Sequence, residues 1–191
     1  LHYSMEVLET QDGSSTILSS DFNVTYHSRF GAIQESEHVF INNGLLPLIQ
    51  TSKEKIRIFE VGFGTGLNLL LTHLVTSQRS LSLNYTTLDI VPLDNTIVDQ
   101  INYVSQLKIG AYYHNFFNTI HELSWGSLHQ LDQLTELKKE LIDLIDYQPP
   151  TEYFNLIYFD AFAPTAQPEL WEENVLEKIY QSMSAGGILV T

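Results

Sequence analysis

The fold is decided by the stretch Ile56-Arg57-Ile58-Phe59-Glu60-Val61-Gly62-Phe63-Gly64-Thr65-Gly66-Leu67-Asn68-Leu69-Leu70-Leu71. A β-branched and aromatic run is followed by three alternate glycines and then by an apolar run, which predicts a strand, a glycine loop and a helix. Glycines let the backbone turn sharply and approach a ligand closely, and the helix directs its first N–H groups into the same space. A tight turn without a ligand remains the alternative, because short glycine motifs are common.

A carboxylate ends this strand immediately before the loop. The spacing is GxGxG and differs from the GxGxxG of nicotinamide and flavin enzymes. Glu60 would repel the pyrophosphate of a dinucleotide but could hold an ammonium group. The cofactor that this arrangement suggests is S-adenosylmethionine, which is cationic and carries no phosphate.

A second carboxylate follows the next expected strand. Residues 81–89 alternate apolar and polar side chains, and Asp89 ends them about twenty residues beyond the loop, where an acid can accept hydrogen bonds from both ribose hydroxyls. Alone, Asp89 is more simply a solvated acid at a strand end, but together with the glycine loop it favours a cofactor site. The pair does not separate adenosyl cofactors from NAD.

Composition restricts the class of protein. The chain has 191 residues, of which 43% are hydrophobic and 17% charged, and this suits one globular domain with a substantial core. We expect no membrane span and no secretory leader, and the simplest location is the cytoplasm. Without cysteine, and without an HxxxH or HExxH pair among the seven histidines, we expect no metal site.

The charge is strongly negative. Twenty-three acidic and nine basic residues give a formal net charge of −14, which argues against a broad nucleic-acid-binding surface, because Lys and Arg supply most nonspecific affinity for phosphates. Any nucleic-acid hypothesis has to answer this objection.

Further elements are expected from residue patterns. Residues 4–9 and 15–20 predict a β-hairpin around Asp12-Gly13, 21–41 predict a lid, and 42–50 a short helix limited by Gly44 and Pro47. We therefore divide the chain into an N-terminal hairpin and lid, 1–45, and a Rossmann-like core, 46–191. Within the core we expect a helix over 93–107, a third strand over 129–139 that leads through Glu140 into a helix over 141–145, a fourth strand over 153–159, a helix over 172–183 and a fifth strand over 188–191.

The fourth strand delivers another acid to the same edge. Asp160 follows it directly and precedes Ala161-Phe162-Ala163-Pro164. Since ligands bind outside the carboxyl ends of parallel strands, Glu60, Asp89 and Asp160 should gather at one rim.

These segments carry a resemblance to a known family. Residues 60–68, the run 160–164 with Gln167-Pro168-Glu169-Leu170-Trp171, and the leader Tyr26-His27-Ser28 with Gly31-Ala32, Glu35 and 38–40 resemble the MnmC-type methyltransferase domain in its stand-alone form, over about 26–191. The resemblance implies a Rossmann-like α/β fold and S-adenosylmethionine-dependent methylation of the amine of 5-aminomethyl-2-thiouridine at the tRNA wobble position, with a partner oxidase as a source of the aminomethyl substrate.

The resemblance also implies roles for residues. Asp160 would be the catalytic acid that binds the substrate ammonium and takes its proton. Glu60 and the loop glycines would hold the methionine end of the cofactor, Asp89 the ribose and Glu140 the adenine amino group. The complete set of expected cofactor residues is Glu60, Gly62, Gly64, Gly66, Asn68, Asp89, Glu140 and, from the lid, Tyr26, Gln34 and Glu35; Phe162 and Pro164 are expected to bind substrate.

Two departures weaken this transfer of roles. A sheet of this type needs two strands beyond the fifth, so the core is expected to be truncated after strand five. The acidity leaves tRNA binding to a partner, to absent segments or to a few basic residues, namely Lys53, Lys55, Arg57, Lys138 and Lys139.

Two other functions remain open. An enzyme related to the aminopropyltransferases, or a small-amine methyltransferase, would use an adenosyl cofactor on a cationic substrate, which suits the acidity. A non-catalytic cofactor-binding module is the other alternative, which the presence of Asp160 disfavours.

Overall fold

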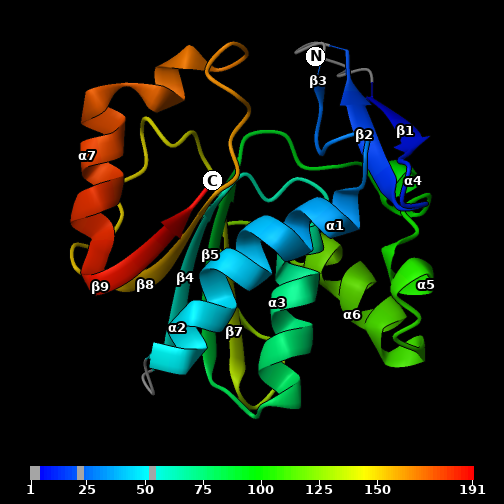
Figure 1. The fold of residues 1–191 in the computed structure, drawn as a ribbon, viewed down its shortest axis with the longest axis horizontal. Helices are drawn as coiled ribbons and strands as arrows, with labels where there is room; N and C mark the ends of the chain where they lie inside the picture. Colours follow the sequence, from blue (N-terminus) through cyan, green and yellow to red (C-terminus); the bar gives the residue numbers. More distant parts are fainter. Residues whose placement is uncertain (1–4, 21–23, 52–54) are drawn as a thin grey trace.

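The computed structural model describes residues 5–20, 24–51 and 55–191. Ser4, Asp21, Asn23 and Lys53, which were part of the sequence-based expectations, lie outside this range. The centre of the molecule is a six-stranded sheet with the order β6-β7-β5-β4-β8-β9 (Figure 1). Its parallel strands are β4 (Ile56–Val61), β5 (Leu83–Asp89), β7 (Thr135–Leu141), β8 (Phe154–Phe159) and β9 (Met183–Val190), and β6 (Ser127–Gln130) pairs antiparallel with β7. The predicted Rossmann-like α/β fold is therefore confirmed.

The neighbouring strands β4 and β8 are buried on both faces, apart from Arg57 near the start of β4. Along β4, Ile58 contributes to one apolar cluster and Phe59 to the other, as expected from the two-residue period of a strand. Helix α3 (Leu67–Gln78) covers the first cluster, and α7 (Glu173–Ser182) covers the second through Val175 and Ile179. Figure 1 shows α2 and α3 over one side of the sheet and α7 beside β8 and β9. This packing fixes the ends of β4 and β8 relative to each other.

The N-terminal hairpin is confirmed and is fastened to the first helix. Strand β1 (Met5–Glu9) pairs with β2 (Ser15–Ser19), and β3 (Val24–Thr25) adds a third strand. In the hairpin loop, Asp12 Oδ2 accepts a hydrogen bond of 3.1 Å from the backbone N–H of Gln34, and Ser14 Oγ accepts one of 3.2 Å from that of Ala32. The hairpin thus satisfies N–H groups that the first turn of a helix leaves free.

The helix expected over 42–50 is much longer. Helix α1 (Ala32–Ser36), the π-helical segment η1 (Glu37–Leu45) and α2 (Leu46–Thr51) follow one another without a break. Gly44 does not end the helix but lets it approach the sheet, because a Cβ there would lie 3.1 Å from Val190 and 3.3 Å from Leu156. The division at 45/46 stays a prediction, although helical backbone continues through it.

The single helix expected over 93–107 is wrong. The segment forms α4 (Asn95–Val98) and α5 (Tyr103–Leu107), separated by a loop. In this loop, Asn102 Nδ2 donates to Gly13 O at 2.9 Å and Asn102 Oδ1 accepts from Ser15 N at 2.8 Å. Contacts with the distant hairpin therefore replace helical hydrogen bonds at this position.

The region before the fourth strand also differs from the expectation. Instead of one strand over 129–139 there are two, β6 and β7, joined by a turn in which Asp132 Oδ1 accepts from Leu134 N at 2.8 Å. The helix over 141–145 is absent: β7 continues to Leu141, and a single turn follows in which Asp143 O accepts from Tyr147 N at 3.0 Å. The aromatic segment before β6 is helix α6 (Ala111–Glu122), and η2 (Pro168–Trp171) precedes α7.

Candidate active site

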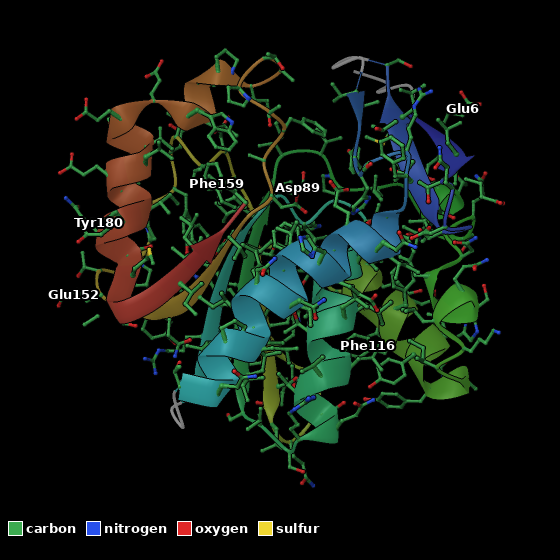
Figure 2. All side chains as sticks on the ribbon, viewed as in Figure 1. Glu6, Asp89, Phe116, Glu152, Phe159 and Tyr180 are labelled. Carbon is green, nitrogen blue, oxygen red and sulfur yellow. The ribbon has the colours of Figure 1, made fainter. Side chains whose placement is uncertain are left out.

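A cavity lies at the carboxyl ends of β4, β5 and β8. Figure 2 places Asp89 at this end of the central strands, on the side of the N-terminal sheet. The wall consists of the glycine loop and of the segments that follow the three strands. The residues that line the cavity are Tyr26, His27, Val61, Gly62, Phe63, Gly64, Thr65, Leu67, Asn68, Leu88, Asp89, Ile90, Val91, Ile142, Asp143, Leu144, Asp160, Ala161, Phe162, Gln167 and Leu170.

Two loop glycines are required by the closeness of their neighbours. Gly62 has φ +91°, and a Cβ there would lie 2.7 Å from the carbonyl oxygen of Asp160. Gly64 has φ +50°, and its Cβ would lie 3.2 Å from the Tyr26 ring. Gly66 has a different place: it does not line the cavity, and a Cβ there would meet His121 Nε2 at 3.1 Å. Gly66 therefore shapes the start of α3.

Asp89 ties the glycine loop to the end of β5. Its Oδ2 accepts from Gly64 N at 2.8 Å, and its Oδ1 accepts from Ile90 N at 2.7 Å and Val91 N at 2.9 Å. Burial raises the pKa of this carboxyl, while the three N–H donors oppose the rise. Asp89 thus presents a fixed carboxyl group to the cavity, as a ribose-binding acid requires.

Asp160 lies on the opposite wall, directly after β8. Its Oδ2 accepts a hydrogen bond of 2.8 Å from Asn68 Nδ2. Burial raises the pKa of Asp160 to about 7, and the charge of Glu35 on α1 adds to the rise. Such an acid can exchange a proton near neutral pH.

Glu60 lies beneath the cavity and is not part of its wall. The side chain is 0% exposed, and Glu60 Oε2 accepts from Thr87 Oγ1 at 2.7 Å. Burial raises the pKa of Glu60 to about 8, so that its protonated form predominates at neutral pH. The sequence suggested that Glu60 contacts the ammonium group of the cofactor, but in this structure its side chain does not reach the cavity.

The lid residues divide into two groups. Tyr26 lines the cavity, with its ring centroid 5.4 Å from that of Phe162, which also lines it. Gln34 is exposed, and Glu35 is partly buried and accepts a hydrogen bond of 2.6 Å from Ser28 N. Neither lines the cavity, and neither does the exposed Pro164.

The expected position of Glu140 is wrong. Glu140 lies within β7 and does not follow the strand, and its Oε1 is 2.6 Å from Lys138 Nζ. It does not line the cavity, whereas Asp143, in the turn after β7, does. The strand is two residues longer at this end than the residue pattern indicated, which moves the acid that reaches the cavity further along the chain.

A group of residues that the sequence did not reveal supports the glycine loop from below. His121 Nε2 is 3.1 Å from Thr65 O, and burial lowers the pKa of His121 to about 4, so that its neutral ring donates to this carbonyl. The His121 ring also lies 5.2 Å from that of Phe63 in the loop. An isolated histidine at the end of a helical segment gives no sequence signal for this role.

Lys139 belongs to the same group. It is 0% exposed, and its Nζ donates to the carbonyl oxygens of Ile120, His121 and Leu123, at 2.8, 3.1 and 2.9 Å. The Nζ lies 5.2 Å from the Phe63 ring centroid and 4.5 Å from that of Trp125, within the range of cation–π attraction. Lys139, one of the few basic residues considered for tRNA contact, is therefore not accessible at the surface.

The cavity suits a cationic adenosyl ligand. Its wall contains the acids Asp89, Asp143 and Asp160 and, within the described part of the chain, no Lys or Arg. Such a wall is unfavourable for a pyrophosphate and favourable for sulfonium and ammonium groups. Apolar side chains from several segments offer contact to an adenine ring: Leu88, Ile90, Val91, Ile142 and Leu144.

Residues 5–20, 24–51 and 55–191 contain neither a candidate metal site nor a candidate membrane helix. Among these residues, no three or more His, Asp or Glu side chains are grouped closely enough to hold a metal ion. None of the helices they form is long and apolar enough to cross a membrane.

Several known proteins are similar to this chain in sequence or in fold. Residues 128–191 match the model of a family described as S-adenosyl-L-methionine-dependent methyltransferase. The chain is 29% identical over 206 residues to the tRNA 5-methylaminomethyl-2-thiouridine biosynthesis bifunctional protein MnmC of Pseudoalteromonas atlantica, and 26% identical over 195 residues to the protein of the same name from an Acidovorax species. These alignments cover 94% and 95% of the chain but 28% and 29% of the two relatives, so the chain spans less than a third of their length.

A solved structure supports the fold. The crystal structure of MNMC2 from Aquifex aeolicus matches with a TM-score of 0.78 at 24% identity, and the match covers 100% of this chain and 60% of the other. The family model names S-adenosyl-L-methionine as the cofactor, and the acidic wall of the cavity suits this cationic molecule. In sequence and fold, the chain is similar to S-adenosyl-L-methionine-dependent methyltransferases and to the MnmC proteins.

Proposed function

We propose that this domain methylates the exocyclic amine of 5-aminomethyl-2-thiouridine at the wobble position of tRNA. The names of the MnmC relatives support a role in the synthesis of 5-methylaminomethyl-2-thiouridine. The observation that carries the proposal is Asp160, a carboxyl group in the cavity wall with a pKa of about 7. The chain spans under a third of the length of those relatives, so their names alone do not assign its substrate. The proposal therefore depends also on the residues of its own cavity.

Asp160 suits the proton transfer that this reaction requires. A primary alkylamine is protonated at neutral pH and must lose a proton before its nitrogen can attack a methyl group. An ionised Asp160 would hold the ammonium group and take its proton, and a pKa near 7 matches this task at neutral pH. The remaining contribution is alignment of the reacting groups in the cavity.

Other residues of the wall would hold the two ligands. S-adenosyl-L-methionine supplies an electrophilic methyl group when bound. Asp89 would accept from the ribose, the backbone of Gly62 and Gly64 would border the methionine end, and Asp143, in place of Glu140, would bind the adenine amino group. Tyr26 and Phe162, with rings 5.4 Å apart, would bound the entrance for the substrate base.

The source of tRNA affinity is a separate part of the proposal. Two basic side chains named as candidates form ion pairs, Lys55 with Glu136 at 3.2 Å and Lys138 with Glu140 at 2.6 Å. Pairing with acids leaves them poorly suited to neutralise phosphates. We propose that tRNA is held largely by segments or partners other than these residues, that an oxidase supplies the aminomethyl substrate, and that the reaction takes place in the cytoplasm.

A second candidate is methyl or aminopropyl transfer to a small soluble amine. The acidic wall formed by Asp89, Asp143 and Asp160 favours it, since a cationic substrate would be attracted without any nucleic-acid surface. An assay that offers both tRNA and a free polyamine separates the two candidate functions. Modification of the polyamine but not of the tRNA would support the second candidate.

The test is methylation of tRNA that carries 5-aminomethyl-2-thiouridine by the full-length protein, with nucleoside analysis by mass spectrometry. We expect one methyl group on the aminomethyl nitrogen. Asp160→Asn keeps the shape and the acceptor oxygen for Asn68, so cofactor binding should persist while the rate falls by about 10²–10⁴-fold. Transfer at the parent rate would remove Asp160 from the chemistry, and no transfer by the unsubstituted protein would contradict the proposed function.

A further inference from the structure

Asn68 stands between the glycine loop and Asp160. It lies in the first turn of α3, two residues after Gly66, and is 3% exposed. Its Nδ2 donates to Asp160 Oδ2 at 2.8 Å, across the cavity end from the strand that carries Asp160. Sequence reasoning assigned Asn68 to the cofactor, but its side chain bonds the proposed catalytic acid and also lowers the pKa of the buried Glu60.

The amide can hold Asp160 in one orientation only. Asn68 Nδ2 carries hydrogens and no lone pair for this purpose, whereas its Oδ1 is an acceptor and would repel a carboxylate oxygen. The amide gives its NH₂ group to Asp160, while its Oδ1 is buried without a hydrogen-bond partner among the described residues. The bond occupies Oδ2 and leaves Oδ1 of the carboxyl group for another partner.

The surroundings make this donor important. The titratable groups whose charges act together with that of Asp160 are Glu35 on α1, Glu60 on β4, Tyr85 on β5 and Tyr103 on α5. Each of these four side chains is neutral when protonated and negative when deprotonated. None of them can therefore stabilise a negative charge on Asp160 by carrying a positive charge. The Asn68 amide stabilises the ionised form, since hydrogen bonds to a carboxylate favour it.

We propose that Asn68 is a positioning residue that holds Asp160 by Oδ2 and keeps it ionised for proton transfer from the substrate amine. The proposal rests on the proposed function. It explains why an asparagine follows the glycine loop: Gly64 N is bonded to Asp89 and Asn68 Nδ2 to Asp160, so one short segment of the chain positions two of the three acids in the cavity wall. Movement of this segment would shift the proposed cofactor-binding residue Asp89 and the proposed proton acceptor Asp160 together.

The test combines a titration with a pH profile of activity. Asn68→Leu keeps a similar shape and removes the donor. With ¹³C-labelled aspartate in the full-length protein, the Asp160 resonance is assigned from its loss in Asp160→Asn, and its pKa is read from the chemical shift. We expect Asn68→Leu to raise this pKa by about one to two units, which is the loss of one hydrogen bond to a charged group.

The activity should follow the titration. At pH 7 kcat should fall about tenfold in Asn68→Leu and recover toward the parent value near pH 9, because the acid limb of the profile moves with the pKa. Thr72→Val is the matched control: Thr72 lies one turn along the same helix, is buried, and bonds Tyr158 OH at 3.0 Å without contacting Asp160. It should lower stability without moving the profile.

The outcomes separate this inference from the proposed function. An unchanged Asp160 pKa in Asn68→Leu, or a rate loss that is equal at pH 7 and pH 9, would overturn the positioning role. If the leucine variant does not fold, Asn68→Ala, which also lacks the donor, is titrated in its place with the same expectation. The titration needs no substrate, so it decides the role of Asn68 even if the tRNA assay shows that the methyl acceptor is another amine.

Discussion

Replacement of Glu60 by glutamine should make stability less dependent on pH. Glu60 is fully buried, and its pKa is raised by burial from 4.5 to about 8. Between these two pH values the folded protein keeps a proton that the unfolded chain has lost, so the contribution of Glu60 to stability falls as pH rises through this window. At 1.36 kcal/mol per pKa unit the fall reaches an upper limit of about 5 kcal/mol.

Glu60→Gln removes the titration and retains the shape. Glutamine can still accept from Thr87 Oγ1, and the loss or gain of its other contacts is the same at every pH. The free energy of unfolding of the variant, relative to the parent, should therefore increase from pH 5 to pH 8.5. Urea denaturation followed by tryptophan fluorescence at several pH values measures this difference.

An exposed strand glutamate provides the control. Glu6 on β1 is exposed, and Glu6→Gln should show no comparable dependence on pH. A difference between Glu60→Gln and the parent that is constant from pH 5 to pH 8.5 would refute the reasoning, since it would mean that Glu60 ionises alike in the folded and unfolded states.

Two further variants test the cavity and its support. Asp89→Ala should weaken binding of S-adenosyl-L-methionine in calorimetric titration by roughly 1–3 kcal/mol, the effect of removing a buried polar partner, while the parent protein should not bind NAD; micromolar NAD binding without any response to the adenosyl cofactor would contradict the assignment of the site. Lys139→Met retains the length of the side chain but loses the bonds to three carbonyl oxygens at the end of α6, so the free energy of unfolding should fall by about 1–3 kcal/mol, and cofactor affinity should fall with it because Phe63 loses its support. Lys138→Met, on the opposite side of the same strand and partly exposed, is the control for the second variant, and equal effects of the two substitutions would argue against a special role for Lys139.

The central strands and the glycine loop could be predicted because their signals are local. Strand β4 has the bounds expected from its β-branched run, and β5 ends at Asp89 as expected. The hairpin follows from alternation around Asp12-Gly13. In each case the residues that determine the element lie within it.

The errors fall where distant contacts decide the backbone. The hairpin breaks the helix expected over 93–107 by binding Asn102, which comes 87 positions after its partner Ser15. The length of β7 depends on its pairing with β5, where Leu141 lies opposite Asp89. Since the end of β7 could not be placed to within two residues, the sequence could not show that Asp143, and not Glu140, lines the cavity.

Glu60 within β4 and Asp160 just after β8 show how a difference of two residues in register separates two roles. Both were expected at the same rim, and their strands are neighbours in which Glu60 lies opposite Tyr158. Glu60 is still inside its strand, so its side chain is enclosed between the sheet and α3 and bonds Thr87. Asp160 is one residue past the end of β8, where the backbone leaves the sheet and the side chain can face the cavity. Burial inside the strand favours the neutral form of Glu60, which therefore has a structural role. An acid just beyond the strand end, such as Asp160, can be reached by a cationic ligand. The position at which each strand ends therefore determines which acids belong to the site.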